Sequence, residues 1–208
     1  MNTKTIVLGA AALTLAVASV PATASAGDYS KHQFGAKLTD NVQPSNSLPA
    51  KACDEMDPAE LCTFVMNEAY GRPNEGHKSS QKGKLKKVKI VSGGATDFRL
   101  QLVKAKYEGG EWQAKVKEQG PWLQTTGQSQ WNWDNDDYKV EKYKVNMKIK
   151  KGWRLAMQTS STSAVRCSNG GDNTLKFAPQ LHSGWGWQTA SDTSGCYPLL
   201  EGKVKYKK

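Results

Sequence analysis

Seven tryptophans stand out among the residues that could contact a ligand. Two pairs are spaced i, i+2, Trp131 with Trp133 and Trp185 with Trp187, and in an extended chain such residues point to the same side. Flat aromatic rings on one face can stack against sugar rings. Glycines flank Trp185 and disfavour a buried strand there. We therefore predict that these four tryptophans bind carbohydrate.

The alternative is that large aromatic rings fill the core of the fold. We expect this of the tryptophans that lie in or beside predicted strands: Trp112, Trp122 and Trp153.

A second feature is a run of lysines with no intervening acid, from Lys78 to Lys89. Positive charge gathered in one segment attracts anionic ligands. We predict anion contacts from the lysines in its strand-like part: Lys84, Lys86, Lys87 and Lys89. The alternative interpretation is that lysines on an edge strand only prevent edge-to-edge aggregation.

The charge of the whole chain supports an anionic partner. Its formal net charge is +10, which favours acidic polysaccharides, teichoic-type polymers or phospholipid head groups. Arginine, which suits bidentate recognition of phosphates and bases, occurs at four positions: Arg72, Arg99, Arg154 and Arg166. This composition argues against nucleic acid as the partner.

An acidic cluster suggests a metal site, formed by Asp134, Asp136 and Asp137. Closely spaced carboxylates suit a hard cation, so structural calcium is one hypothesis. The spacing does not match an EF-hand, because Lys139 and Val145 would occupy ligand positions. The alternative is an ordinary polar turn. Beyond this calcium, the sequence indicates no cofactor.

No catalytic motif is present. The histidines, His32, His77 and His182, lie outside any H-E-x-x-H pattern, and no G-x-S-x-G occurs. We therefore expect a non-catalytic binding module, for carbohydrate or an anionic envelope polymer. Two alternatives stay open: a secreted hydrolase whose active site only the fold assembles, and a structural or protein-interaction module. The oligomeric state also stays open.

The beginning of the chain predicts export. Lys4 precedes an uncharged apolar run over residues 6–20, and small residues follow at 24–26. This is the pattern of a cleavable signal peptide over residues 1–26. The apolar run is shorter than a membrane span, and no later run is long enough. We expect a secreted protein with no membrane span in its mature chain.

Four cysteines follow the predicted cleavage site: Cys53, Cys62, Cys167 and Cys196. An even number in an exported chain indicates two disulfides. Three connectivities are possible, of which Cys53–Cys62 and Cys167–Cys196 close the shortest loops. The spacing does not suit a zinc site, because no C-x2-C pair occurs.

The elements that position these residues are predicted to be β-strands. Apolar and polar residues alternate in several runs after residue 84, for example over 98–102, 112–116 and 143–149. In the last of these runs the lysines share the solvent face. Gly109-Gly110 indicates a hairpin. We predict an all-β fold, an antiparallel, jelly-roll-like β-sandwich over residues 52–208.

Two segments before these strands are predicted differently. Residues 27–51 are polar and rich in Asn, Ser and Pro, which predicts a flexible leader. Asp57-Pro58 indicates a helix start, with a short helix to about Tyr70. The apolar residues 64–66 are equally compatible with a strand.

Several short motifs resemble those of a group of exported bacterial β-sandwich proteins of unknown function. They are Lys150-Lys151-Gly152, the segment 162–168, Gly170-Gly171, Gly195-Cys196, Leu199-Leu200-Glu201 and Cys62-Thr63. The resemblance implies a jelly-roll-like sandwich in which Cys167 and Cys196 pair. It implies no catalytic residues.

Overall fold

The computed structural model describes residues 28–38, 41–42, 61–69, 71, 76–127, 131–132, 137–160 and 164–208. This part of the chain contains strands and no helix. The strands are β1 Tyr29–Gly35, β2 Asn41–Val42, β3 Cys62–Met66, β4 Gly83–Ile90, β5 Asp97–Glu108, β6 Glu111–Gln124, β7 Trp131–Asn132, β8 Asp137–Lys139, β9 Glu141–Ile149, β10 Arg154–Thr159, β11 Cys167–Phe177, β12 Gln188–Thr189, β13 Asp192–Pro198 and β14 Leu200–Lys207.

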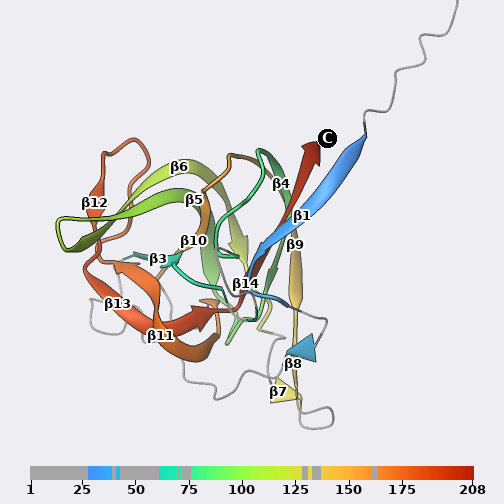
Figure 1. The fold of residues 1–208 in the computed structure, drawn as a ribbon. Coiled ribbons are helices and arrows are strands. Elements are labelled where there is room, and N and C mark those ends of the chain that lie inside the picture. The colour runs from blue at the N-terminus through green and yellow to red at the C-terminus, as the bar shows by residue number, and fades with distance from the viewer. Residues whose placement is uncertain are drawn as a thin grey trace, which may run out of the picture.

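Two main sheets form the body of the molecule (Figure 1). The four-stranded sheet has the order β1-β14-β4-β9, and the seven-stranded sheet has the order β12-β6-β5-β10-β3-β11-β13. A small sheet, β2-β8-β7, lies at one end. The main-sheet pairings are antiparallel. The predicted all-β, antiparallel sandwich is therefore confirmed.

The main core lies between the two sheets. Leu85, Val88 and Val204 contribute from the four-stranded sheet, and Leu100 and Leu155 contribute from the seven-stranded sheet; all five are fully buried. Side chains of a strand alternate between its faces, so the apolar period of two directs one face of each sheet inward.

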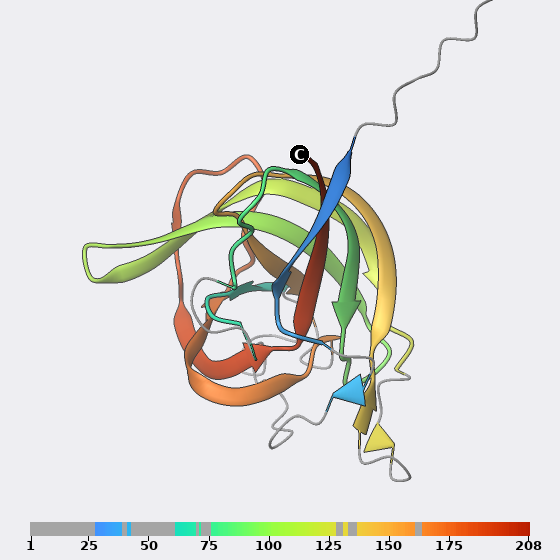
Figure 2. The same cartoon turned by 45° about the vertical axis from the view of Figure 1, so that its right-hand side comes forward.

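A second core covers the other face of the seven-stranded sheet. Val65, Ala156, Phe177 and Leu181 pack together there. Strand β10 therefore contributes to both cores, with Ala156 in the second and its neighbours Leu155 and Met157 in the first. Figure 2 shows the long strands β5 and β6 curving around the molecule and ending in a projecting hairpin. The hairpin turns at Gly109-Gly110, as predicted, and both glycines have positive φ.

Part of the segment that we expected to be a flexible leader is a strand. Residues 29–35 form β1, which pairs with β14 along its whole length. Phe34 is fully buried. This one large apolar residue anchors an otherwise mostly polar strand to the main core. The expectation of a flexible leader is therefore wrong for residues 29–35.

The expected helix up to Tyr70 is also wrong where the structure describes it, because residues 62–66 form β3. This strand lies between β10 and β11 and is buried along its length. A strand with neighbours on both sides and cores on both faces reads as a continuous apolar run, which explains why its sequence showed no alternation.

One predicted disulfide, Cys167–Cys196, is present and joins β11 to β13, with 5.4 Å between the Cα atoms. It packs against Phe64 and Cys62 in a small core. Cys62 is also disulfide-bonded, and its expected partner, Cys53, lies outside the described residues. Disulfides of this kind are typical of an oxidising compartment. In the described ranges, no helix has the length and apolar character to cross a bilayer.

Candidate functional site

The outer face of the four-stranded sheet is covered by lysines, and we call it the lysine face. It receives one lysine from β1, four from β4, three from β9 and three from β14. These are Lys31, Lys84, Lys86, Lys87, Lys89, Lys142, Lys144, Lys148, Lys203, Lys205 and Lys207. The four lysines of β4, predicted as anion contacts, lie in the middle of this surface because β4 is between β14 and β9.

Register places these lysines directly opposite one another. One row crosses all four strands and consists of Lys31, Lys205, Lys84 and Lys148. The next row consists of Lys203, Lys87 and Lys144, with Gln33 at its β1 end. Residues directly opposite in an antiparallel pair have Cβ atoms about 4.5–5.5 Å apart, and like charges there destabilise the sheet. The sheet therefore carries unfavourable charge pairs across its full width.

An irregularity in β4 brings all four of its lysines to this face. Strict alternation would place Lys84 and Lys86 on one side of the sheet and Lys87 and Lys89 on the other. The register with both neighbouring strands shifts around Lys86 and Lys87, so two consecutive residues point outward. The bulge thus adds a positive charge without turning Leu85 or Val88 out of the core.

Acids in the four strands are buried and already bonded. The carboxylate of Glu201 accepts hydrogen bonds from the backbone N–H of Leu38 and the side chain of Gln33, and it pairs with Lys89 at 3.5 Å. The carboxylate of Glu141 accepts from Ser92, Tyr143 and the N–H of Thr126. Glu201 thus neutralises part of the lysine face at Lys89, whereas the rows through Lys84 and Lys87 contain no acid.

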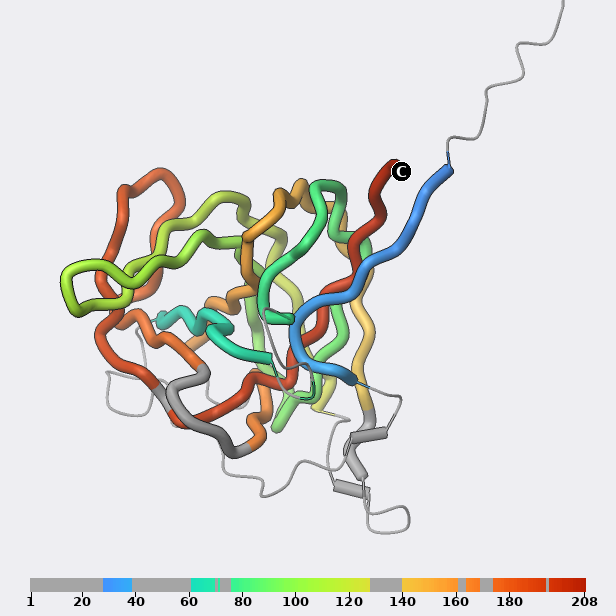
Figure 3. The backbone as a smooth tube through the Cα atoms, in the orientation of Figure 1, coloured from blue at the N-terminus to red at the C-terminus, as the bar shows by residue number. Residues whose placement is uncertain are grey.

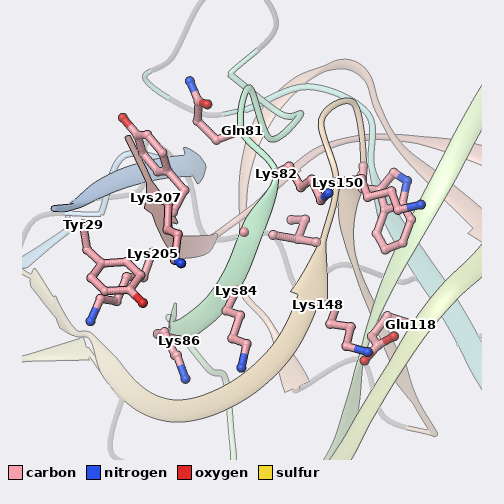
Figure 4. Close-up of a pocket in the computed structure, with 14 residues that line it drawn as sticks. Tyr29, Gln81, Lys82, Lys84, Lys86, Glu118, Lys148, Lys150, Lys205 and Lys207 are labelled. Atoms are coloured by element: carbon pink, nitrogen blue, oxygen red, sulfur yellow. The ribbon is translucent and has the colours of Figure 1, made fainter. Parts of the chain in front are cut away.

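A hollow of about 840 Å³ opens at one end of the lysine face (Figure 4). Its walls include seven lysines and the rings of Tyr29, Trp153 and Tyr206, and Glu118 is the one acid among the lining residues. Two of the lysines, Lys82 and Lys150, come from the loops beside β4 and β9. The ammonium of Lys205 lies 4.0 Å from the Tyr29 ring centroid. The hollow can therefore surround a multiply charged anion.

A smaller hollow of about 140 Å³ lies further along the same face. It is lined by Gln33, Lys87, Lys89, Lys142, Glu201 and Lys203. Both hollows thus open between outward-pointing lysines, which gives the face grooves as well as charge.

A separate aromatic site lies on the loop before β12. The Trp185 ring is 60% exposed, and it stacks on His182 with 4.2 Å between ring centroids and 26° between planes. The Trp187 ring, 37% exposed, has the ammonium groups of Lys106 and Lys115 each 4.6 Å from its centroid. The two rings therefore have different partners, and Trp185 is the one that offers a broad open surface.

Buried polar groups fix the start of this loop. The N–H of Leu181 donates to the Thr63 hydroxyl, and the Gln101 side chain donates to the carbonyl of Leu181. Thr63 and Gln101 are both fully buried. The N–H of Gln180 donates to the carbonyl of Leu61, which adds a third tie to the region of β3. The loop that carries the aromatic site is thus fixed at its start by hydrogen bonds.

Most of the other predicted site residues lie outside the part of the chain that the structure describes. Trp133, Asp134 and Asp136 fall outside the described residues. Trp131 is in β7 and Asp137 in β8, one step apart across that pairing. Among the described residues, no group of three or more His, Cys, Asp or Glu could hold a metal. The calcium hypothesis therefore stays a prediction.

Of the three tryptophans that we expected in the core, two lie in or against a core and one is exposed. Trp153 is buried in the main core, and Trp112 packs against the second core with the Arg154 guanidinium 5.3 Å from its ring. Trp122 is 46% exposed, with the Arg99 guanidinium 5.5 Å from its ring. For Trp122 the core prediction is wrong, because it lies on an outward-facing position near the end of the long strand β6.

The three histidines lie in unrelated surroundings. His32 stacks on Phe34 and hydrogen-bonds to Ser80, and His182 supports Trp185. Burial, together with the nearby charges of Arg154 and Lys78, lowers the pKa of His77 to about 4.

Lysines of β1 and β14 were missed as site residues by sequence reasoning. Their alternation, with lysines at 203, 205 and 207, was a signal for a charged strand face. Nothing in the sequence indicated that β14 lies beside β4, which is what joins their lysines into one surface.

No protein-family model matches the chain, and no curated protein or solved structure matches it either. The resemblance to exported bacterial β-sandwich proteins therefore stays a prediction.

Proposed function

We propose that this protein is an exported, non-catalytic binding module that holds an anionic polymer of the cell envelope on its lysine face. The observation that carries the proposal is the row Lys31–Lys205–Lys84–Lys148, in which like charges oppose one another across all four strands. Such pairs cost stability when the face is empty. A bound polyanion would remove that cost, because each ammonium would then face a negative group.

The alternative explanation, protection of a sheet edge, does not fit the position of these lysines. Lysines that prevent aggregation belong on edge strands. Strands β4 and β14 carry seven of the lysines and are the two interior strands of the sheet. Their backbone groups are already paired on both sides, so edge protection gives no reason for this charge.

Lysine, with little arginine, suits a polymer that is recognised by charge rather than by a particular group. Its ammonium is a compact point charge on a flexible stem, whereas arginine suits bidentate recognition. In Figure 4, Lys84 and Lys86 extend from β4 to the same side. Their flexible stems can follow negative groups of different spacing, which fits a repeating anionic polymer.

The test compares two double variants with the same net charge. In K84Q/K205Q the two lysines lie at the centre of the all-lysine row; in K37Q/K104Q two exposed lysines outside the four strands are changed. Binding to long-chain inorganic polyphosphate is measured as a function of salt. We expect the row variant to bind more weakly, with the slope of log K against log salt smaller by about 2, since each lost contact removes about 1.

The control variant should stay close to the wild type in both affinity and slope. Equal losses in the two double variants would contradict the proposal, because they would mean that net charge alone governs binding. Absence of polyphosphate binding by the wild type at low salt would contradict it as well.

A further inference from the structure

We infer that the aromatic site is a second binding site, at which the open face of Trp185 stacks against the pyranose ring of an uncharged glycan. This inference goes beyond the proposed function, since it concerns another surface and another chemistry. In both ribbon views the loop before β12 and the β5–β6 hairpin lie on the opposite side of the molecule from β1 and β14 (Figures 1 and 2). Nothing in it depends on the lysine face.

The first support is the geometry of the ring. One side of Trp185 is covered by His182 at 4.2 Å, while 60% of the residue stays exposed. The neighbouring glycines, Gly184 and Gly186, have open space where a side chain would stand. An indole that is supported on one side and open on the other is a flat amphipathic surface of the kind that stacks on planar ligands.

The second support is that the loop is already ordered. Its start is tied to the buried Thr63 and Gln101 through Leu181. Its end is tied through the N–H of Ala190, which donates to the carbonyl of Trp112 at 2.8 Å. Figure 3 shows this loop beside the β5–β6 hairpin. A ligand would therefore find the ring in place and would not have to order the loop, which favours affinity.

The third support is the mixed charge around Trp187, two residues after Trp185, which suits an uncharged ligand. Lys106 forms an ion pair with Glu108, and the Thr189 hydroxyl lies 3.5 Å from the Glu111 carboxylate. The ammoniums of Lys106 and Lys115 lie over Trp187. Hydrogen-bond donors and acceptors of this kind suit the hydroxyls of a sugar, whereas the rows of the lysine face offer positive charge only.

The experiment measures retention of the whole protein on insoluble cellulose, chitin and starch in 0.5 M NaCl. At this salt concentration charge attraction between exposed groups is largely screened, so binding through the lysine face is suppressed. We expect retention on at least one of the three, and Trp185→Ala should weaken it about tenfold or more, as for a central aromatic contact. Trp185→Tyr, which keeps a flat ring, should retain part of the binding.

The matched control is Trp122→Ala, which removes a similarly exposed tryptophan from another part of the fold. It should leave retention unchanged. Equal losses in the Trp185 and Trp122 variants, or no retention of the wild type on any of the three polysaccharides, would overturn the inference. A loss in Trp185→Ala that is accompanied by a large fall in thermal stability, with Trp185→Tyr also inactive, would overturn it too. The proposed function is tested separately, by polyphosphate binding at low salt, so failure of this inference can be distinguished from failure of that proposal.

Discussion

At the scale of the residue, the lysine pairs of the four-stranded sheet are an interaction that opposes folding. Lys84 lies opposite Lys205 on one side and Lys148 on the other. Like charges in such positions cost roughly 0.2–1 kcal/mol each. The sheet tolerates them because the apolar residues on its inner face, such as Leu85 and Val204, are fully buried.

Lys84→Gln should therefore stabilise the protein while it weakens polyanion binding. We expect the free energy of unfolding to rise by about 0.5–1 kcal/mol at low salt, because two like-charge pairs are removed. The gain should shrink at 1 M salt, where the charges are screened. Urea denaturation at both salt concentrations checks this, with Lys37→Gln as a control expected within about 0.5 kcal/mol of the wild type. A loss of stability at low salt would contradict the account.

His77 should make stability depend on pH. Its pKa is about 4 in the folded protein, lowered chiefly by burial, against about 6.5 in the unfolded chain. The unfolded state therefore binds more protons, so stability is full above pH 6.5 and falls as the pH drops toward 4. After allowance for solvent screening of this half-buried ring, we expect a loss of about 1–2 kcal/mol.

Denaturation curves between pH 7.5 and 5 measure this dependence, a range in which most carboxylates stay ionised. His77→Gln should flatten the curve over that range, because the variant has no imidazole to protonate. An identical pH dependence in the two proteins would show that His77 is not the group responsible.

At the scale of the element, the position of β1 depends on one residue. Phe34 is fully buried, and its ring lies where a side chain at Gly202 of β14 would stand, 2.6 Å from such a Cβ. The glycine thus leaves room for the ring, and the ring covers the glycine. This contact explains how a mostly polar segment becomes a strand.

Phe34→Ala should destabilise the protein by about 3–5 kcal/mol, the usual cost of removing a buried phenylalanine. It should also release β1, so that backbone amides of residues 29–35 exchange hydrogen faster than those of β4. Hydrogen exchange followed by mass spectrometry measures both segments in one experiment. Unchanged protection of β1 would mean that its backbone pairing with β14 suffices to hold it.

Strands with clear alternation were predictable from the sequence, and those without it were not. The runs around Leu100 and Val145 alternate between apolar and polar residues. Strand β9 has an exposed face, and strand β5 has exposed ends. Strand β3 is buried on both faces and has no such pattern. All four lysines of β4 lie on one face because of a bulge. The bulge depends on which strands lie beside β4, and the sequence does not indicate these neighbours.

The candidate sites were predictable to a similar degree. The sequence predicted that Trp185 is exposed and that the lysines of β4 share one segment, because flanking glycines and composition are local signals; their role in binding stays a prediction. It did not indicate that Trp187 lies under two ammonium groups, or that His182 supports Trp185. Those contacts join residues far apart along the chain or across a loop, and local patterns do not report them.

At the scale of the whole molecule, the lysine face and the aromatic site are carried by different sheets. The four-stranded sheet carries the first, while the second lies where β12 meets β6 in the seven-stranded sheet. Because no residue is shared between them, substitutions at the two sites should have independent effects on free energy. If both proposals hold, one molecule could contact a charged and an uncharged polymer at the same time.

The place of β14 in the sheet has a consequence for the order in which the strands can pair as the chain is synthesised. Strand β14 lies between β1 and β4, although it follows both in the chain by more than a hundred residues. Until β14 is present, β1 and one edge of β4 lack the partner that they have among the described strands. Pairings between distant segments form slowly and leave strand edges open to aggregation in the meantime. The rows of lysines that cross the four-stranded sheet are therefore assembled only after β14 has paired with both β1 and β4.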